Sequence, residues 1–402
     1  MKKVYIFSQV FPPDTASVSQ HLGDFVEELK KTKCKITVFT ANRDYEKPDK
    51  KYKSYVNDNI SVIRIAQIPY SKKKKLSRAL SFIYFNISLF FAALKNVEKN
   101  SVLISLTTPP LLSVMVSIIA RLKRSTQINW IMDLQPELSI ATNTLKQGLM
   151  TDILLNMSLT SYRKSDMNIL LDRYMKEYLE SEKINPSKIK VCPVWSPIGE
   201  EFNSPRLDNP FRREHGFKEK FVVMYSGNHA VVHPLDTALQ AAFALRNDDR
   251  FLFVFIGGGV RVQDVSDFKD IHRLKNIIQL PYQPREKIKY SLTSADAHLV
   301  ILGESLVGFT HPNKVYGALN VGKPIVYIGP KESHITDLIK PIEGNIAVMH
   351  GESDKLVKGL KVLIAKSEDH QKQISSKHKL LAKSFSKDIL ASKLVSAVKT
   401  FL

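Results

Sequence analysis

The segment from residue 302 to 330 combines glycines, a proline and a lysine around an expected helix start. It reads LGESLVGFTHPNKVYGALNVGKPIVYIGP, and Lys314 stands where the helix should begin. Free backbone N–H groups at a helix N-terminus attract anions, and a lysine beside them adds positive charge. The pattern therefore indicates a phosphate site. A glycine loop with a solvated lysine would give the same pattern, and this alternative stays open.

Patterns typical of metal sites and disulfide frameworks are missing from the sequence. The two cysteines are Cys34 and Cys192, and neither belongs to a CxxC pair. No DxD pair occurs in an expected strand-end loop, and no His, Asp and Glu residues cluster at ligand spacing. We therefore expect no metal and no cofactor, and a reducing compartment fits the cysteine content.

Length and charge restrict the class of protein. The chain has 402 residues, of which 59 are Lys or Arg and 39 are Asp or Glu, a net charge of +20. This length predicts two domains and the composition excludes a disordered chain. The charge would attract nucleotides, nucleic acid or an acidic membrane. The N-terminal apolar stretch is too short for a signal peptide, and the stretches 80–94 and 111–122 are shorter than the ~20 residues that span a bilayer.

The elements that must position these residues alternate between strands and helices. Apolar runs predict strands at 4–7, 35–41, 60–65, 101–106 and 127–132, with helices between them that include 80–94 and 111–122. Such alternation builds a parallel sheet, whose ligands bind at the carboxyl ends of the strands. The first half is therefore predicted to be a Rossmann-like domain.

The same alternation restarts near residue 221. We expect strands at 221–227, 251–259, 277–280, 297–302 and 324–329, with helices at 234–245, 284–294 and 313–320. The predicted fold is α/β, with two Rossmann-like domains that face a cleft. We expect an N-terminal domain at 1–195, a linker at 196–210 that is rich in Pro, Asn and Ser, a C-terminal domain at 211–380, and a helix at 381–402 that packs back across the domains.

Taken together, these motifs resemble the family-4 retaining glycosyltransferases of the two-Rossmann (GT-B) fold. The second half carries the likeness in YSGNHAVVHPLDT, FIGGG, LPYQPREKIKYSLTSADAHLVIL and HPNKVYGALNVGKPIVYIG. The first half carries it in FSQVFPPD, TTPPLLSVMVSIIARLKR and DLQPE. The chain looks closest to the branch of bacterial surface-polysaccharide enzymes that includes fucosaminyl transferases of O-antigen assembly.

The resemblance implies a nucleoside diphosphate sugar, expected to be UDP-linked, as the donor, and a glycan acceptor that is expected to be lipid-linked. It implies donor contacts from Gly227, Asn228, His233, Arg261, Glu304, Gly308, His311, Asn313 and Lys314. Lys314 and Asp133 are the expected catalytic residues, although Asp133 could instead cap a helix. Ser17 and His21 are expected on the acceptor side, where His21 could be structural.

The sequence departs from the family pattern at the donor site. Asn228 and His233 stand where the family usually has Arg and Lys on the donor diphosphate, which replaces two cations by an amide and a group charged part of the time. Lys314, and after it Arg261, are then the expected sources of positive charge. Phe309 and Gly317 occupy the positions of the two family glutamates, so Glu304 is the candidate that holds the ribose. Thr15, Ala16 and Ser17 replace the glycine pair of the first loop.

A basic run precedes an aromatic, apolar helix in the first half. Lys72, Lys73, Lys74 and Lys75 come shortly before FIYFNISLFF. This combination is typical of a membrane-surface anchor, although a solvated loop before a packed helix would also produce it. We therefore expect a cytoplasmic protein that is peripheral on the inner face of the plasma membrane.

Two other functions fit parts of the sequence. A nucleotide-sugar 2-epimerase has the same fold, but the FSQVFPPD and DLQPE loops disfavour it, and product analysis without an acceptor would separate the two. A nucleic-acid-binding protein would use the +20 charge. It would need stacking aromatics interleaved with basic residues along one groove, whereas these lysines are scattered.

Overall fold

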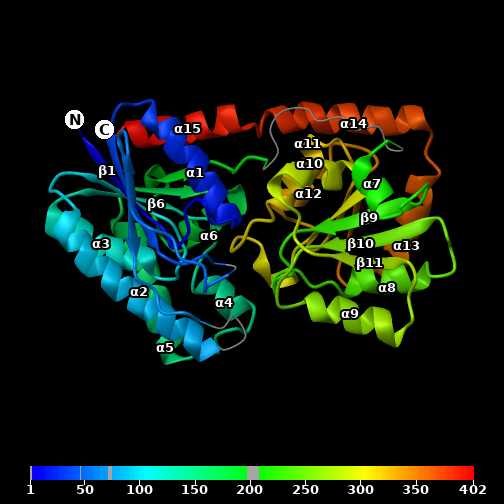
Figure 1. Cartoon of the computed structure of the whole chain (residues 1–402), viewed down its shortest axis with the longest axis horizontal. Helices are drawn as coiled ribbons and strands as arrows, with labels where there is room; N and C mark the ends of the chain where they lie inside the picture. Colours follow the sequence, from blue (N-terminus) through cyan, green and yellow to red (C-terminus); the bar gives the residue numbers. More distant parts are fainter. Residues whose placement is uncertain (1, 46, 71–74, 197–207) are drawn as a thin grey trace. The chain divides into compact units, whose positions relative to one another are not determined.

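The computed structural model describes residues 2–45, 47–70, 75–196 and 208–402 (Figure 1). The chain divides into two compact units, each built on its own sheet. Unit 1 contains Met1–Val194, Gly308–His311 and Lys387–Leu402, and unit 2 contains Trp195–Val307 and Pro312–Ser386. The prediction of two α/β domains is confirmed. Most of the expected linker, 197–207, lies outside the described residues.

The sheet of unit 1 has eight strands in the described part of the chain, in the order β3-β4-β2-β1-β5-β6-β7-β8. Neighbouring strands are parallel except for β3 and β4. All strands expected in this half are present, and β3, β7 and β8 are additional. The strands are β1 (Lys3–Phe7), β2 (Lys35–Ala41), β3 (Tyr55–Asn57), β4 (Ile60–Ile65), β5 (Val102–Ser105), β6 (Thr126–Trp130), β7 (Met167–Leu170) and β8 (Ile189–Val191).

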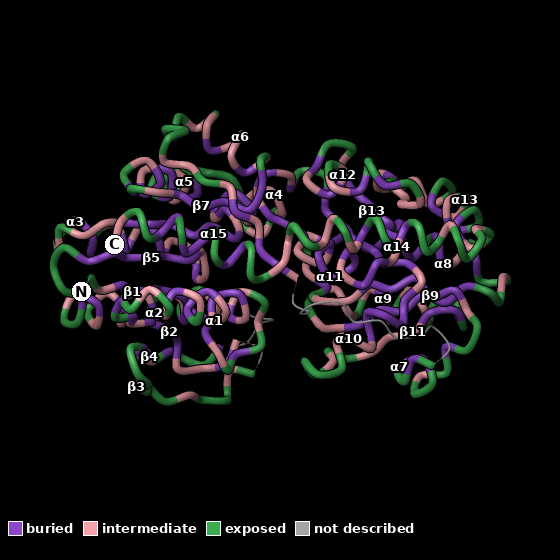
Figure 2. Tube along the Cα trace, turned by 90° about the horizontal axis from the view of Figure 1, so that it is seen from above, coloured by how far each residue is buried: buried purple, intermediate pink, exposed green. Residues whose placement is uncertain are grey.

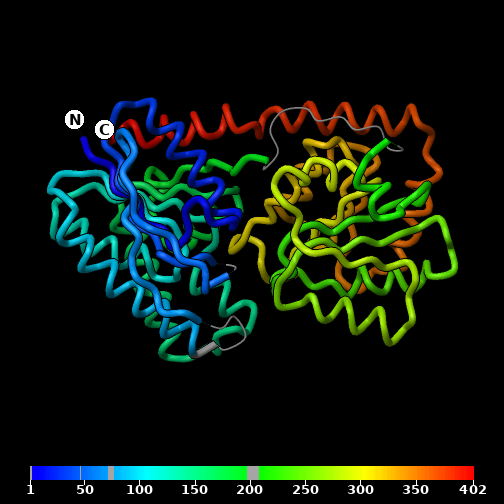
Figure 3. The backbone as a smooth tube through the Cα atoms, viewed as in Figure 1, coloured from blue at the N-terminus to red at the C-terminus, as the bar shows by residue number. Residues whose placement is uncertain are grey.

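Helices cover the sheet of unit 1, as Figures 1 and 3 show. Phe85 and Leu89 of α2, with Val116 and Ile119 of α3, pack with Phe7 of β1 and other strand residues into one core cluster. Helix α15 packs against α1. The helices are α1 (Ser17–Lys30), α2 (Lys75–Asn96), α3 (Leu112–Lys123), α4 (Glu137–Ala141), α5 (Leu149–Lys164), α6 (Arg173–Ser181) and α15 (Lys387–Lys399).

Helix α2 is longer than the sequence suggested. It spans 22 residues, and its segment Ser77–Asn96 is, among the described residues, the one helical stretch long and apolar enough to cross a membrane. The expectation that this stretch is too short is therefore wrong. Length and composition alone are weak grounds for a membrane span, since core helices of other proteins share them.

The sheet of unit 2 is parallel throughout, in the order β11-β10-β9-β12-β13-β14. Its strands are β9 (Phe221–Ser226), β10 (Phe251–Ile256), β11 (Ile277–Leu280), β12 (Ala297–Ile301), β13 (Ile325–Ile328) and β14 (Ile346–Val348). Its longer helices are α8 (Asp236–Ala244), α9 (Val262–Ile271), α10 (Arg285–Thr293), α13 (Ser353–Ile364) and α14 (Glu368–Lys383). The shorter ones are α7 (Pro210–Glu214), η2 (Glu304–Leu306), α11 (Lys314–Asn320) and α12 (His334–Ile339).

Most strand residues of the unit 2 sheet are buried and appear purple in Figure 2. Val223 and Tyr225 of β9 belong to one core cluster, while Val222 and Met224 belong to another. Successive strand residues point to opposite faces, so helices cover both sides of the sheet. The apolar runs that predicted these strands are continuous for this reason.

Two helices occupy the C-terminal region in place of the one that we expected at 381–402. Helix α14 belongs to unit 2 and packs against α11, whereas α15 belongs to unit 1. Ser384, Phe385 and Ser386 connect them. The chain therefore returns to the unit in which it began.

Candidate functional site

Two glycine-bearing loops meet at the carboxyl ends of β9 and β10 in unit 2. Gly227 has a φ of 133° and Gly257 a φ of 135°, values in a region that other residues rarely adopt. A Cβ atom on Gly257 would collide with the backbone of Gly227. Because neither glycine has a side chain, the two loops can touch. The space at the end of β9 is then available to a neighbouring side chain.

Lys314 fills this opening. It is the first residue of α11, and a Cβ atom on Gly227 would lie 2.7 Å from Lys314 Cε. The Lys314 Nζ lies 3.1 Å from His233 Nε2 and 5.0 Å from the centre of the Tyr225 ring. Burial lowers the pKa of Lys314 from 10.5 to about 8. The predicted phosphate-binding lysine is thus a partly desolvated amine rather than a solvated one.

His233 is a buried, neutral hydrogen-bond acceptor toward Lys314. Its Nδ1 lies 2.6 Å from the carbonyl oxygen of Ile301, which can only accept, so Nδ1 carries the ring proton and Nε2 is free to accept. Burial, together with the nearby Lys314 ammonium, places the pKa of His233 well below 6.5. The idea that His233 supplies charge part of the time is therefore wrong for this arrangement.

Other predicted donor residues surround Lys314. The Tyr225 hydroxyl donates to the Asn228 carbonyl oxygen at 2.7 Å, which fixes the backbone of the loop after β9. Asn313 precedes α11, and its Oδ1 is buried without a hydrogen-bond partner among the described residues. Such an acceptor is costly to bury, so it is a candidate for a contact with a ligand donor.

Arg261 and Glu304 have different surroundings. Arg261 Nε donates to Asp264 at 2.6 Å and Arg261 Nη2 to Asp236 at 3.4 Å, so two carboxylates already share its charge. Glu304 opens η2 and lines a hollow of about 380 Å³ with Asp236, Gln240 and His350 among others. A larger hollow of about 500 Å³ lies around α12 and contains none of the predicted site residues.

Asp133 lies in unit 1, directly beyond β6. Its Oδ1 accepts a hydrogen bond from the Thr310 hydroxyl at 2.5 Å, and the Leu134 N–H donates to the Phe309 carbonyl at 2.8 Å. Burial raises the pKa of Asp133 above 3.8. Pro136, not Asp133, occupies the N-cap position of the next helix, α4, so the alternative that Asp133 is a helix cap is wrong.

His311 also belongs to unit 1. Its Nδ1 lies 2.7 Å from Asp172 Oδ2, and both side chains are buried. Asp172 in turn caps α6 by accepting from the Met175 N–H at 2.9 Å. Gly308 lies in the same short segment, against the Tyr174 backbone. The sequence grouped Gly308 and His311 with the donor residues, whereas their contacts place them in the unit that holds Asp133.

The acceptor-side candidates lie on α1. Ser17 is the first residue of this helix, and His21 is 4% exposed. Burial lowers the pKa of His21 to about 4, so this histidine is neutral at physiological pH. These properties fit the structural alternative for His21.

Sequence reasoning missed a buried carboxyl group near Asp133. Glu137 is 4% exposed, and the Tyr178 hydroxyl donates to its Oε1 at 3.3 Å. Burial raises the pKa of Glu137 to about 7. The DLQPE motif contains this residue, but the spacing of the motif does not predict that the Glu137 side chain is buried.

Comparisons with known proteins agree with this architecture. No protein-family model matches the chain. The chain is 28% identical to the probable glycosyltransferase WbjE of Pseudomonas aeruginosa over 278 residues, which is 67% of each chain. It is 20% identical to the putative colanic acid biosynthesis glycosyl transferase WcaI of Escherichia coli K12, over 89% of this chain and 91% of that one.

Solved structures share the fold. Anabaena Alr3699/HepE, crystallised with UDP and glucose, superimposes over 100% of both chains with a TM-score of 0.72 and 13% identity. WaaG, a glycosyltransferase involved in lipopolysaccharide biosynthesis, gives a TM-score of 0.71 and 10% identity over 98% of this chain and 99% of that one. The chain has the GT-B fold. Its fold and its sequence relatives support a GT-B glycosyltransferase and favour neither the 2-epimerase nor the nucleic-acid-binding alternative.

Proposed function

We propose that the protein is a retaining glycosyltransferase of bacterial surface-polysaccharide synthesis that uses a UDP-linked sugar. The observation that carries this proposal is the position of Lys314, whose amine lies over Gly227 at the carboxyl end of β9. Ligands of open parallel sheets bind at this edge. The similarity to WbjE and WcaI, and the UDP bound by HepE, support the class of reaction and of donor.

The chemistry would depend on charge stabilisation. As the bond from sugar to diphosphate breaks, negative charge grows on the leaving group, and a cation held in a desolvated site stabilises it most effectively. Lys314 would supply this charge, while the carboxylate of Asp133 would orient the sugar or the acceptor. We infer that divalent metal is dispensable, because Lys314 would neutralise the charge of the leaving diphosphate, which a metal ion neutralises in other transferases.

A ligand screen and a product assay test this proposal. The full chain would be melted with UDP, GDP, CDP and their sugars, because a ligand at 100 times its dissociation constant stabilises a protein by ~2.7 kcal/mol. The donor identified in this way would be incubated with polyisoprenyl diphosphate sugars, and NMR would give the anomeric configuration of the product. We expect UDP to stabilise the protein and the configuration to be retained. An inverted product would contradict the mechanism, and absence of any nucleotide effect would contradict the function.

We further propose that unit 1 lies on an anionic membrane surface, where a lipid-linked acceptor would be found. Leu80, Ile83, Ile87 and Phe91 follow one another at helical spacing on α2, and each is at least 54% exposed. Such a stripe on a helix without acidic residues is typical of interfacial helices. Lys72, Lys73 and Lys74 lie outside the described residues, and Lys75 begins α2.

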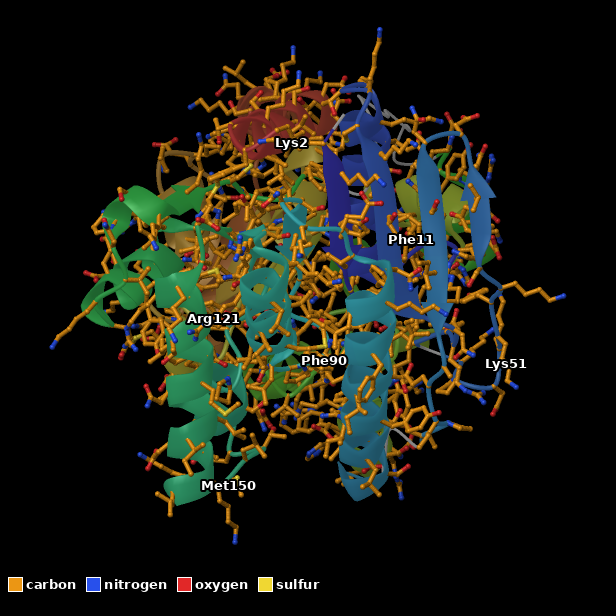
Figure 4. All side chains as sticks on the ribbon, turned by 90° about the vertical axis from the view of Figure 1, so that its left-hand side faces the viewer. Lys2, Phe11, Lys51, Phe90, Arg121 and Met150 are labelled. Atoms are coloured by element: carbon orange, nitrogen blue, oxygen red, sulfur yellow. The ribbon has the colours of Figure 1, made fainter. Side chains whose placement is uncertain are left out.

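Helices near α2 also expose apolar residues. Helix α3 contacts both α2 and α5. On α5, Leu149 is 79% and Met150 is 69% exposed. Figure 4 shows Met150 at the free end of α5 and Phe90 on α2. The sequences of α2 and α3 contain basic and no acidic residues, which suits an acidic lipid surface.

A further inference from the structure

Lys314 and the buried His233 form a part-buried pair in which only one partner can carry charge. His233 Nδ1 is committed to the Ile301 carbonyl, so its Nε2 faces Lys314 as an acceptor at 3.1 Å. Protonation of Nε2 would leave two donors facing each other and would bring two cations together. Any positive charge of this pair therefore resides on Lys314.

In the part of the chain that the structure describes, the titratable groups around the pair are neutral. The groups that face Lys314 are Tyr225 of β9 and, in the loop after it, His229 and His233. Burial raises the pKa of Tyr225 and lowers the pKa of His229 to about 4, so both are neutral at physiological pH. Burial is also the cause of the lowered pKa of Lys314, about 8. A negatively charged ligand beside the amine would raise the pKa of Lys314 again.

We propose that His233 is a positioning residue for Lys314, and that in alkaline solution, where the free amine is mostly neutral, binding of the donor diphosphate is coupled to proton uptake by the Lys314 amine. This inference rests on the proposed function, because it takes the ligand to be a nucleoside diphosphate. His233 holds the amine over Gly227 when the site is empty. The bound diphosphate then receives the ammonium as a charge-assisted hydrogen-bond donor.

Calorimetry of the full chain with UDP measures this coupling directly. Titrations at pH 8.5 in two buffers of different ionisation enthalpy give the number of protons taken up. We expect ~0.7 proton per UDP, because an amine with a pKa of about 8 is mostly neutral at this pH, whereas UDP, with a last phosphate pKa near 6, is already fully ionised. The dissociation constant should rise ~10-fold between pH 7 and pH 9.

Three controls separate this coupling from other sources of protons. Uridine lacks the diphosphate and should bind without proton uptake. Lys314→Met should reduce the uptake with UDP to near zero. His298→Gln changes another buried histidine of unit 2, whose Nε2 contacts the Leu292 carbonyl, and should leave the uptake unchanged.

Variants of His233 test the positioning role. His233→Ala removes the acceptor and should weaken UDP binding ~10-fold, while His233→Gln, whose amide oxygen can accept, should retain most of the affinity. In a Lys314→Met background, His233→Ala should have no further effect, because the two residues act as one unit. An equal loss in both backgrounds would overturn the positioning role.

The outcomes separate the proton coupling from the proposed function. UDP binding without proton uptake would overturn the coupling and leave the proposed function standing. Absence of UDP binding would contradict both the UDP-linked donor and the inference. If His233→Ala does not fold, the proton counts of the parent, Lys314→Met and His233→Gln still decide the coupling.

Discussion

Replacement of Lys314 by methionine should make the protein more stable and less active. Methionine keeps an unbranched side chain that can lie over Gly227, and it removes the charge. The folded pKa of Lys314, about 8, is below its ordinary value of 10.5, so the fold disfavours the charged amine. At pH 7 the amine is charged in both the folded and the unfolded state, and burial of this charge destabilises the fold. The stability rises only as the pH increases from 8 toward 10.5, where the folded protein has lost this proton and the unfolded chain has not. Lys314→Met should therefore raise the melting temperature at pH 7.

The loss of activity can be estimated from the lost contact. A hydrogen bond to a charged group contributes ~1.5 to 3 kcal/mol, which corresponds to a ~10- to ~150-fold decrease in kcat/KM. The decrease should be mainly in kcat, because the charge of the diphosphate grows in the transition state.

Steady-state kinetics with the UDP-sugar donor, together with calorimetric melting, tests both effects. Lys287→Met is a matched control, because Lys287 is exposed and pairs with Glu214 on the surface of unit 2. This control should keep parental kcat/KM. If Lys314→Met keeps near-parental activity while Arg261→Ala loses it, the diphosphate contact belongs to the other loop and the reasoning is refuted.

The remaining predictions concern the ribose, the lipid surface, metal and pH. Glu304→Gln should weaken UDP binding with little change in melting temperature; an unchanged dissociation constant would exclude a ribose contact. Changing Lys72–Lys75 to Gln, or Ile83 and Ile87 together to Ser, should reduce sedimentation with acidic liposomes, and parental sedimentation would contradict the surface on α2. Turnover in EDTA should equal turnover in magnesium, whereas complete loss restored by metal would contradict a metal-independent reaction. The melting temperature should fall as the pH drops from 6.5 to 4. Burial lowers the pKa of His298 and of similar histidines to about 4 in the folded state, so the unfolded chain takes up protons first and unfolding is favoured. His298→Gln should make this fall less steep.

The alternation of strands and helices was predictable where strands are continuous apolar runs, as in β5 and β10, whereas the short strands β3 and β8 carry no such run. Expected strand 4–7 corresponds to β1, and expected helix 234–245 corresponds to α8. The segment that forms α5, β7 and α6 was not assigned. Helix α5 exposes several apolar residues, including Leu149 and Met150, so its pattern does not separate a core face from a solvent face.

The functional residues were only partly predictable, because their contacts join distant parts of the chain. Lys314 was identified from its motif, but its partner His233 is 81 residues away, and the tautomer of His233 depends on the Ile301 carbonyl. Asp172 contacts His311 across 139 residues and was missed. Burial lowers the pKa of Lys314 and of His233, and no spacing rule predicts burial.

The histidine at position 233, where the resemblance implies a lysine, becomes understandable from the site itself. If His233 were a lysine, as the resemblance implies for this position, two ammonium groups would compete for one desolvated space above Tyr225. A neutral histidine with Nδ1 fixed by Ile301 instead accepts from Lys314 and lets this single amine carry the charge. His233→Lys should consequently lower the melting temperature at pH 7, and Lys314→Met should restore it, because one of the two facing cations is then gone. If His233→Lys melts at the parental temperature, the space accommodates both charges and the proposed division of roles between the two residues is wrong.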